Sequence, residues 1–171
     1  MAPLINRTYN RVEFKWLKEY LDQRYPGAAI EFEKKLTVPG EPYFSAASGG
    51  LQPTLARRII AKLDAFLTFP DHYEVWEAKQ YAGFNAVSQL EQYKETIGST
   101  YEGQNHLKEP ITYHLLTSHA KPEVQKTAES RGIEYVVYFP AWLRQTQQLV
   151  QEQGFQRRIA YYDKLHGAGQ G

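Results

Sequence analysis

Two apolar, strand-like segments joined by a short turn are the feature of this sequence that most limits its fold. Residues 57–68 (RRIIAKLDAFLT) and 73–80 (YEVWEAKQ) are rich in β-branched, aromatic and other apolar side chains. The tetrapeptide FPDH at 69–72 lies between them and carries the turn residues Pro and Asp. The segments therefore predict a β-hairpin, followed by a helix at 85–97 with Gly98 as its end.

Charged residues interrupt both strands of this hairpin. Asp64 lies in the first strand, and Glu77 and Lys79 lie in the second. Because side chains alternate along a strand, Glu77 and Lys79 point the same way, about 7 Å apart, and the hairpin can bring Asp64 beside Glu77. Unpaired charge among apolar strands is costly, so such a cluster predicts a bound divalent cation. The alternative is a surface salt bridge of Glu77 with Lys79 and an Asp64 that only ends a strand.

Length and composition set broad limits. With 171 residues, 42% of them hydrophobic, the chain suits one folded domain, and we expect a single domain over residues 1–171. The formal net charge of +1 does not indicate a nucleic-acid partner, so any such binding needs local clusters such as Arg57-Arg58, which are equally compatible with a solvated surface. The absence of cysteine excludes disulfides and thiolate zinc sites.

The remaining pattern predicts a mixed α/β (α+β) fold. Helices are expected at 8–25 and 122–130 and strands at 28–38, 111–118 and 133–139; residues 99–105 are expected to be a loop. The apolar run 133–139 is typical of a strand covered on both faces. After residue 141 we expect a helix broken at Gly154. The order α-β-β-β-α-β-α-β-α predicts a mixed central sheet flanked by helices.

This order, together with four short motifs, resembles the PD-(D/E)xK nuclease superfamily, most closely its RecB-type and Cas4-type exonuclease branch. The matching segments are Ala61-Lys62-Leu63-Asp64, Glu77-Ala78-Lys79 and the Gln89 to Tyr93 segment QLEQY, and an acidic residue of the family's first helix corresponds to Glu13. The likeness implies a restriction-endonuclease-like αβββαβ core over about residues 8–140, with a helical extension at 141–166. Ala61 stands where the family has glycine. The Pro-Asp dipeptide of this sequence, Pro70-Asp71, lies in the turn and too close to Glu77, so Asp64 is taken as the aspartate of the motif.

The resemblance implies roles for these residues. Asp64 and Glu77, with the carbonyl of Ala78, are expected to bind Mg²⁺ or Mn²⁺. Lys79 is expected to act on the attacking water or on the phosphate, and its two carboxylate neighbours favour an electrostatic role over that of a base. Glu13 is expected to add an outer contact to the site, unless it is only solvated.

Further residues are expected to support the site and to bind DNA. Gln89 and Tyr93 lie one turn apart on one face of the predicted helix, where they could support the site and contact phosphates. Arg57, Arg58 and Lys62 are the expected basic DNA contacts on the first strand of the hairpin.

The sequence thus predicts a magnesium-dependent deoxyribonuclease that hydrolyses DNA phosphodiester bonds and is associated with a phage or mobile element. Two alternatives stay open: a non-catalytic structural component of a viral or other assembly, and an endonuclease like the Holliday-junction resolvases. DNA is the expected partner, and a homo-oligomer or larger assembly is left open. The N-terminus MAPLINRTYN lacks the apolar run of a signal peptide, so we expect no membrane association and a cytoplasmic location (host cytoplasm, or the virion if phage-encoded).

Overall fold

A five-stranded mixed sheet with helices on both faces forms the main body of the protein. The computed structural model describes residues 4–40, 43–44, 53–54 and 57–166. The chain divides into two compact units, residues 1–138 and 139–171. In chain order the first unit contains α1 (Leu4–Arg24), β1 (Ala29–Pro39), β2 (Tyr43–Phe44), β3 (Pro53–Thr54), β4 (Arg57–Thr68), β5 (Tyr73–Lys79), α2 (Phe84–Thr96), α3 (Tyr101–His106), β6 (Ile111–Thr117), α4 (Pro122–Ser130) and β7 (Ile133–Val137).

The sheet has the strand order β1-β4-β5-β6-β7. The β1–β4 and β4–β5 pairs are antiparallel, whereas the β5–β6 and β6–β7 pairs are parallel. In the tight turn between β4 and β5 the amide of Phe69 donates to the carbonyl of His72 at 2.9 Å. The α-β-β-β-α-β order, the hairpin and the mixed sheet expected from the sequence are therefore confirmed.

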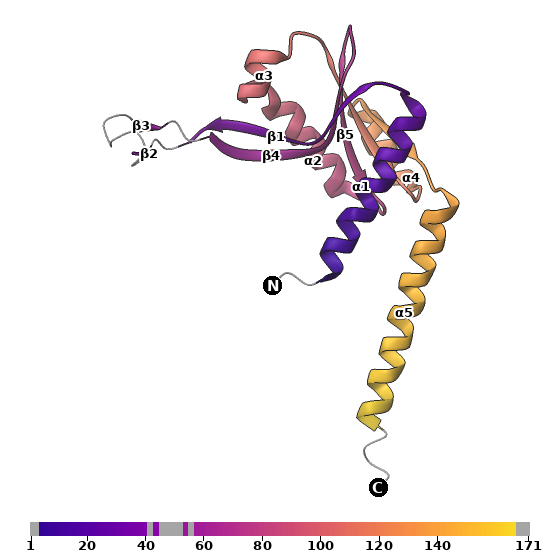
Figure 1. The fold of residues 1–171 in the computed structure, drawn as a ribbon. Coiled ribbons are helices and arrows are strands. Elements are labelled where there is room, and N and C mark those ends of the chain that lie inside the picture. Colours follow the sequence, from indigo (N-terminus) through magenta and orange to yellow (C-terminus); the bar gives the residue numbers. More distant parts are fainter. Residues whose placement is uncertain (1–3, 41–42, 45–52, 55–56, 167–171) are drawn as a thin grey trace. The chain divides into compact units, whose positions relative to one another are not determined.

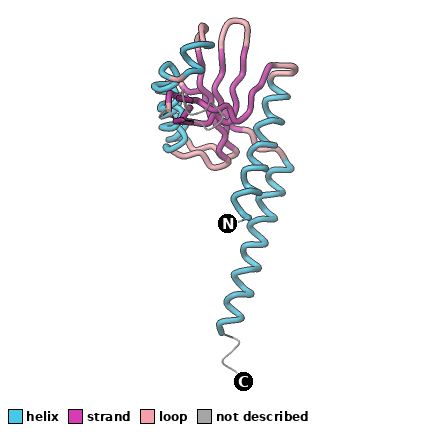
Figure 2. The backbone as a smooth tube through the Cα atoms, turned by 60° about the vertical axis from the view of Figure 1, so that its left-hand side comes forward, coloured by secondary structure: helices cyan, strands magenta, loops and turns pink. Residues whose placement is uncertain are grey.

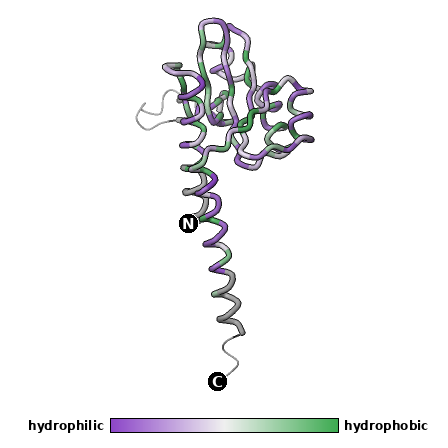
Figure 3. Tube along the Cα trace, turned by 90° about the vertical axis from the view of Figure 1, so that its right-hand side faces the viewer, coloured by the Kyte–Doolittle hydropathy of each residue, from purple (hydrophilic) through white to green (hydrophobic). Residues whose placement is uncertain are grey.

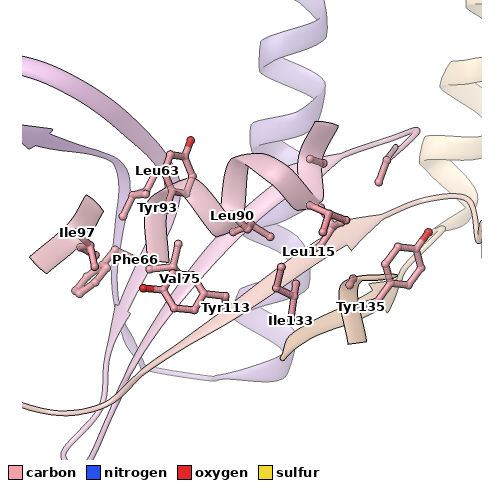
Figure 4. Packing of buried hydrophobic residues seen from close by; sticks show 14 of the residues in the cluster. Leu63, Phe66, Val75, Leu90, Tyr93, Ile97, Tyr113, Leu115, Ile133 and Tyr135 are labelled. Atoms are coloured by element: carbon pink, nitrogen blue, oxygen red, sulfur yellow. The ribbon is translucent and has the colours of Figure 1, made fainter. Parts of the chain in front are cut away.

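Helices cover the two faces of the sheet differently. Figure 2 shows α1 on one face and α2, α3 and α4 on the other. On the α2 side a buried cluster joins strand, helix and loop residues, among them Leu63, Val75, Leu90, Tyr93 and Leu115 (Figure 4). This packing fixes β5 between β4 and β6, in the middle of the sheet.

The first helix is tied to the far edge of the sheet by hydrogen bonds. Trp16 is fully buried, and its indole Nε1 donates to the carbonyl of Tyr138 at 3.0 Å. The Tyr138 hydroxyl donates to Glu19 at 2.7 Å, and Arg24 donates to both carboxylate oxygens of Glu134 at 3.1 Å. The position of α1 therefore depends on β7 and the residue that follows it.

Strands β1 and β4 continue past the end of β5 as a two-stranded ribbon (Figure 1). Their pairing runs from Ala29–Thr68 to Pro39–Arg57 and shifts by one residue between Leu36 and Thr37. Such a bulge bends a strand pair and increases its twist. The ribbon exposes Ile59 and the basic residue Arg58 of β4.

The second unit consists mainly of one helix, α5 (Ala141–His166). The break expected at Gly154 is wrong, because the helix continues through it; an isolated glycine lowers helix propensity by only about 1 kcal/mol. In its first half hydrophilic residues predominate (Figure 3). Leu149 and Val150 in this half, and Phe155 just beyond it, are exposed. No helix within residues 4–40 or 57–166 is long and apolar enough to cross a membrane.

Two other expectations are corrected. The expected loop at 99–105 contains α3, whose N-cap Thr100 accepts a hydrogen bond from the amide of Gly103 at 3.0 Å. The run 133–139 does not form a strand covered on both faces: β7 is the edge strand, and Glu134 and Val137 are exposed. In both places tertiary contacts override the local pattern.

Gly103 supplies a test of how α3 packs. A Cβ built on Gly103 would lie 1.9 Å from the carbonyl oxygen of Ile97, a backbone atom that cannot easily move, whereas Gly98 has nothing within 4 Å. We expect Gly103→Ala to lower the free energy of unfolding by about 2 kcal/mol, measured by urea denaturation. The matched variant Gly98→Ala should stay within about 0.5 kcal/mol of the wild type. Equal effects of the two changes would contradict this packing.

Candidate active site

The hairpin of β4 and β5 brings Asp64, Glu77 and Lys79 together at the carboxyl end of β5. The amide of Ala78 donates to Asp64 Oδ2 at 2.9 Å, which fixes this carboxylate against the central strand. Lys79 Nζ lies 2.9 Å from Glu77 Oε1 and 3.9 Å from Asp64 Oδ2. The convergence expected from the sequence is therefore present; the catalytic roles of these residues stay predictions.

Glu77 is the unusual member of this group. It is fully buried, and neither of its carboxylate oxygens accepts a well-formed hydrogen bond, although Lys79 lies within ion-pair distance. Burial, and then the negative charge of Asp64, raise the pKa of Glu77 to about 7. Lys79 shares its single positive charge between Glu77 and Asp64, so it does not neutralise both buried carboxylates.

The pKa values of Asp64 and Lys79 are both raised, for different reasons. Burial raises the pKa of Asp64 above its ordinary value, although the Lys79 ammonium and the Ala78 amide oppose the shift. Burial opposes ionisation of Lys79, but the carboxylates of Glu77 and Asp64 outweigh it and raise the pKa of Lys79. Lys79 is thus held as an ammonium, which favours the expected electrostatic role over that of a base.

Glu13 reaches this group from α1. It lines a cavity of about 180 Å³ with Phe14, Leu17, Glu33, Lys62, Asp64, Ala78 and Lys79. Burial raises the pKa of Glu13, while Lys79 lowers it and Asp64 raises it. The sequence left open whether Glu13 points to the sheet or to water; the structure places it in the cavity.

Gln89 and Tyr93 connect α2 to the same region. Gln89 Nε2 donates to the Tyr93 hydroxyl, which donates to the carbonyl of Lys62 at 3.1 Å. Burial, and then the negative charge of Glu77, raise the pKa of Tyr93 to about 12. Both side chains also line an open groove of about 580 Å³ with Ile60, Ala61, Asn85, Ser88, Gln92 and Thr96. They therefore support β4 next to Asp64, as expected for a supporting pair.

The basic residues of β4 divide between the site and the ribbon. Lys62 lines the cavity and pairs with Glu33 at 2.7 Å. Arg57 and Arg58 lie further out on the ribbon, and the Arg57 guanidinium stacks on the ring of Tyr101, 4.7 Å from its centroid. The three residues expected to contact DNA thus extend along one strand away from the carboxylates.

Glu33 is a site residue that the sequence does not reveal. Its φ of +53° lies in the left-handed region, which residues other than glycine rarely adopt. On β1 its neighbours Phe32 and Lys34 pair with Ala65 and Leu63, so Glu33 lies opposite Asp64. The alternation EFEKK predicts only an exposed strand position, and no local signal marks the backbone distortion.

The site offers carboxylate oxygens as ligands for a divalent cation. No group of three His, Cys, Asp or Glu side chains within the described part of the chain already has an arrangement able to hold a metal. The carboxylates of Glu77 and Asp64 are nevertheless adjacent and offer hard anionic oxygens, the ligands of Mg²⁺, which usually keeps several waters. The residues present therefore fit Mg²⁺ or Mn²⁺ in chemical type.

Comparison with known proteins gives only distant likenesses. No protein-family model and no curated protein matches the chain. The crystal structure of a repair endonuclease from Pyrococcus abyssi is similar at 16% identity and a TM-score of 0.47, over 74% of this chain and 46% of that one. The structure of an EndoMS-dsDNA2 complex is similar at 17% identity and a TM-score of 0.45, over 74% and 44%. The chain thus spans less than half the length of either structure, and the proposals below rest on its own geometry.

The pKa of Glu77 predicts an unusual pH dependence of stability in metal-free buffer. Because the folded-state pKa of about 7 exceeds the ordinary 4.5, the folded protein keeps a proton that the unfolded chain has released between these values. The free energy of unfolding should therefore fall as pH rises through this window, by up to about 3 kcal/mol. Because this raised pKa already includes the attraction of Lys79, we expect Glu77→Gln to remove the loss and to be about 2 kcal/mol more stable than the wild type at pH 8.

Glu74 provides the matched control on the same strand. It is also buried, but its carboxylate accepts hydrogen bonds from Trp76 Nε1 at 2.7 Å and from the Tyr25 hydroxyl at 2.9 Å. Glu74→Gln should destabilise the protein by about 1–3 kcal/mol, because an amide replaces one acceptor oxygen by a donor. Chemical denaturation between pH 4 and 8 measures both variants, and a Glu77→Gln protein less stable than the wild type at pH 8 would refute the prediction.

Proposed function

We propose that the chain is a metal-dependent deoxyribonuclease that hydrolyses phosphodiester bonds at the group formed by Asp64, Glu77 and Lys79. The observation that carries this proposal is the fully buried Glu77 carboxylate, which lies beside a second carboxylate, Asp64, and shares with it the ammonium of Lys79. A structural role alone gives no reason to keep two carboxylates beside one ammonium at the end of a central strand.

Asp64 and Glu77 are the proposed ligands of Mg²⁺ or Mn²⁺, with the Ala78 carbonyl as a further ligand implied by the family likeness. When bound, the ion supplies charge neutralisation for the phosphate and a more acidic water. Lys79, held as an ammonium, stabilises negative charge that builds on the phosphate oxygens. Glu13 occupies the opposite wall of the cavity and orients polar groups, including water, in it.

Among the described residues, basic side chains that suit a polyanionic substrate follow β4 outward from the site. Lys62, Arg58 and Arg57 follow β4 outward from the cavity along the ribbon. On the α2 side, the open groove presents neutral hydrogen-bonding groups such as Asn85 and Gln92. We assign phosphate contacts to the basic ribbon, because electrostatic contact with the backbone dominates the affinity of proteins for DNA.

A non-catalytic assembly component and a Holliday-junction-resolvase-like endonuclease are the competing functions. The first requires neither a metal nor Lys79, so the two experiments below separate it from an enzyme. The second requires a symmetric dimer that nicks branched DNA in preference to linear DNA, which gel filtration and a set of linear and branched substrates can test. Association with a phage or mobile element stays a prediction from the sequence.

Metal binding should stabilise the protein. A ligand of the folded state at about 100 times its Kd adds about 2.7 kcal/mol, so the unfolding midpoint should rise when Mg²⁺ or Mn²⁺ is added at pH 8. Asp64→Asn and Glu77→Gln should abolish the rise, and Glu74→Gln should retain it. Thermal denaturation followed by circular dichroism measures the effect. A wild-type midpoint that neither ion moves would contradict the metal site.

DNA hydrolysis should require Lys79. The purified protein with Mg²⁺ is expected to degrade or nick DNA, and Lys79→Ala should lower the rate by about 10²–10³, the usual loss when one charge-stabilising group is removed. Lys126→Ala on α4, an exposed lysine that does not line the cavity, is the control and should retain the wild-type rate. Circular dichroism verifies that both variants fold. Full activity of Lys79→Ala would remove this residue from the mechanism.

A further inference from the structure

The turn that follows β5 presents exposed aromatic rings directly beyond the candidate active site. Tyr81 is 47% exposed and Phe84, the first residue of α2, is 52% exposed. Tyr81 stacks on His119, with ring centroids 4.5 Å apart and an interplanar angle of 19°. We call Tyr81, His119 and Phe84 the aromatic shelf.

The two rings of the stacked pair stand on rigid backbone. The carbonyl oxygen of Gln80 accepts from the amide of Ser118 at 3.2 Å and from its hydroxyl at 2.6 Å. The Thr117 hydroxyl lies 3.2 Å from the same carbonyl and accepts from the amide of Ala82 at 3.2 Å. Ser118 Oγ also lies 2.8 Å from Nδ1 of His119 and so fixes that ring. Hydrogen bonds therefore hold the two segments that carry Tyr81 and His119, one after β5 and one after β6, against each other.

The shelf lies at the same edge of the sheet as the carboxylates. Lys79 pairs with Thr117 across the parallel strands β5 and β6, so both strands end here, and ligands of such sheets bind beyond the carboxyl ends of the strands. Tyr81 follows Lys79 by two residues, which span at most about 7 Å of chain. A nucleotide whose phosphate contacts Lys79 can therefore place a neighbouring base at Tyr81.

We propose that the aromatic shelf stacks with an unpaired base of the DNA strand whose phosphate lies at Lys79, so that the substrate is single-stranded or locally unpaired DNA. This inference rests on the proposed nuclease function. Inside a duplex both faces of a base are covered by its neighbours, and only an unstacked base offers a face to an aromatic ring. Isolated exposed hydrophobic side chains need no explanation, but an exposed ring pair fixed by backbone hydrogen bonds beside a charged cavity is an ordered surface.

Binding experiments test the shelf separately from catalysis. Fluorescence anisotropy with Ca²⁺ in place of Mg²⁺ compares an oligothymidylate of about 12 nucleotides with a duplex of the same length. Tyr81→Leu should weaken binding of the single strand about tenfold, the usual loss for one stacked base, and should leave duplex binding unchanged. Tyr81→Trp, which keeps an aromatic face, should restore single-strand binding. Phe155→Leu on α5 is the control for losing an exposed ring and should have no effect.

The outcomes distinguish failure of the shelf from failure of the nuclease proposal. If the wild type cleaves DNA but Tyr81→Leu binds the single strand as the wild type does, or weakens single strand and duplex equally, the shelf is refuted and the nuclease stands. If no DNA is cleaved yet single-strand binding depends on Tyr81, the shelf stands as a nucleic-acid-binding surface and the nuclease proposal fails. A preference of the wild type for duplex also overturns the shelf.

Discussion

The carboxylate of Glu77, buried in the central strand next to Lys79 and Asp64, is the interaction on which the site depends. The apolar packing around β5 removes water from Glu77, and the nearby Asp64 makes its ionisation still less favourable. Glu74, three residues earlier, is equally inaccessible but fully supplied with donors by Tyr25 and Trp76. Two glutamates of one strand thus differ in their partners: Glu74 accepts from two neutral donors, whereas Glu77 shares the Lys79 ammonium with Asp64. A further positive charge at this place would balance the second carboxylate.

The two strands beside β5, β4 and β6, carry different kinds of side chain to this edge of the sheet. On one side, β4 carries Asp64 into the site and continues into the basic ribbon. On the other side, β6 ends at Thr117 and is followed by Ser118, and the hydroxyls of both residues fix the turn that bears Tyr81. Charge is therefore concentrated toward β4 and aromatic surface toward β6. A polynucleotide that follows this edge meets groups for its phosphates and for its bases in separate places.

Much of this arrangement could be predicted from the sequence, because short-range patterns determine it. The hairpin at 57–79 has a recognisable turn and alternating strands, so the approach of Asp64 to Glu77 follows from local rules. Glu33 could not be predicted, because no residue in its surroundings, such as a glycine, marks its left-handed backbone. The helix α3 and the edge position of β7 depend on tertiary packing, which the local sequence does not determine. The continuous helix α5 shows that a single glycine does not reliably predict a helix break. The expected metal and catalytic roles lie beyond what a pattern of residues determines.

The attachment of α1 has a consequence for how the protein is made. Trp16, Glu19 and Arg24 are held by partners at 134–138, so the helix that carries Glu13 has its anchor more than a hundred residues downstream. During synthesis the acidic pair and Lys79 emerge together from the ribosome, long before the last strand. Phe14 and Tyr20 of α1 also contact Phe32 and Trp76 of earlier strands, but the hydrogen bonds from Trp16, Tyr138 and Arg24 form only when the last strand has joined the sheet. A chain that ends before this strand therefore lacks the hydrogen bonds that hold the Glu13 wall of the cavity in place.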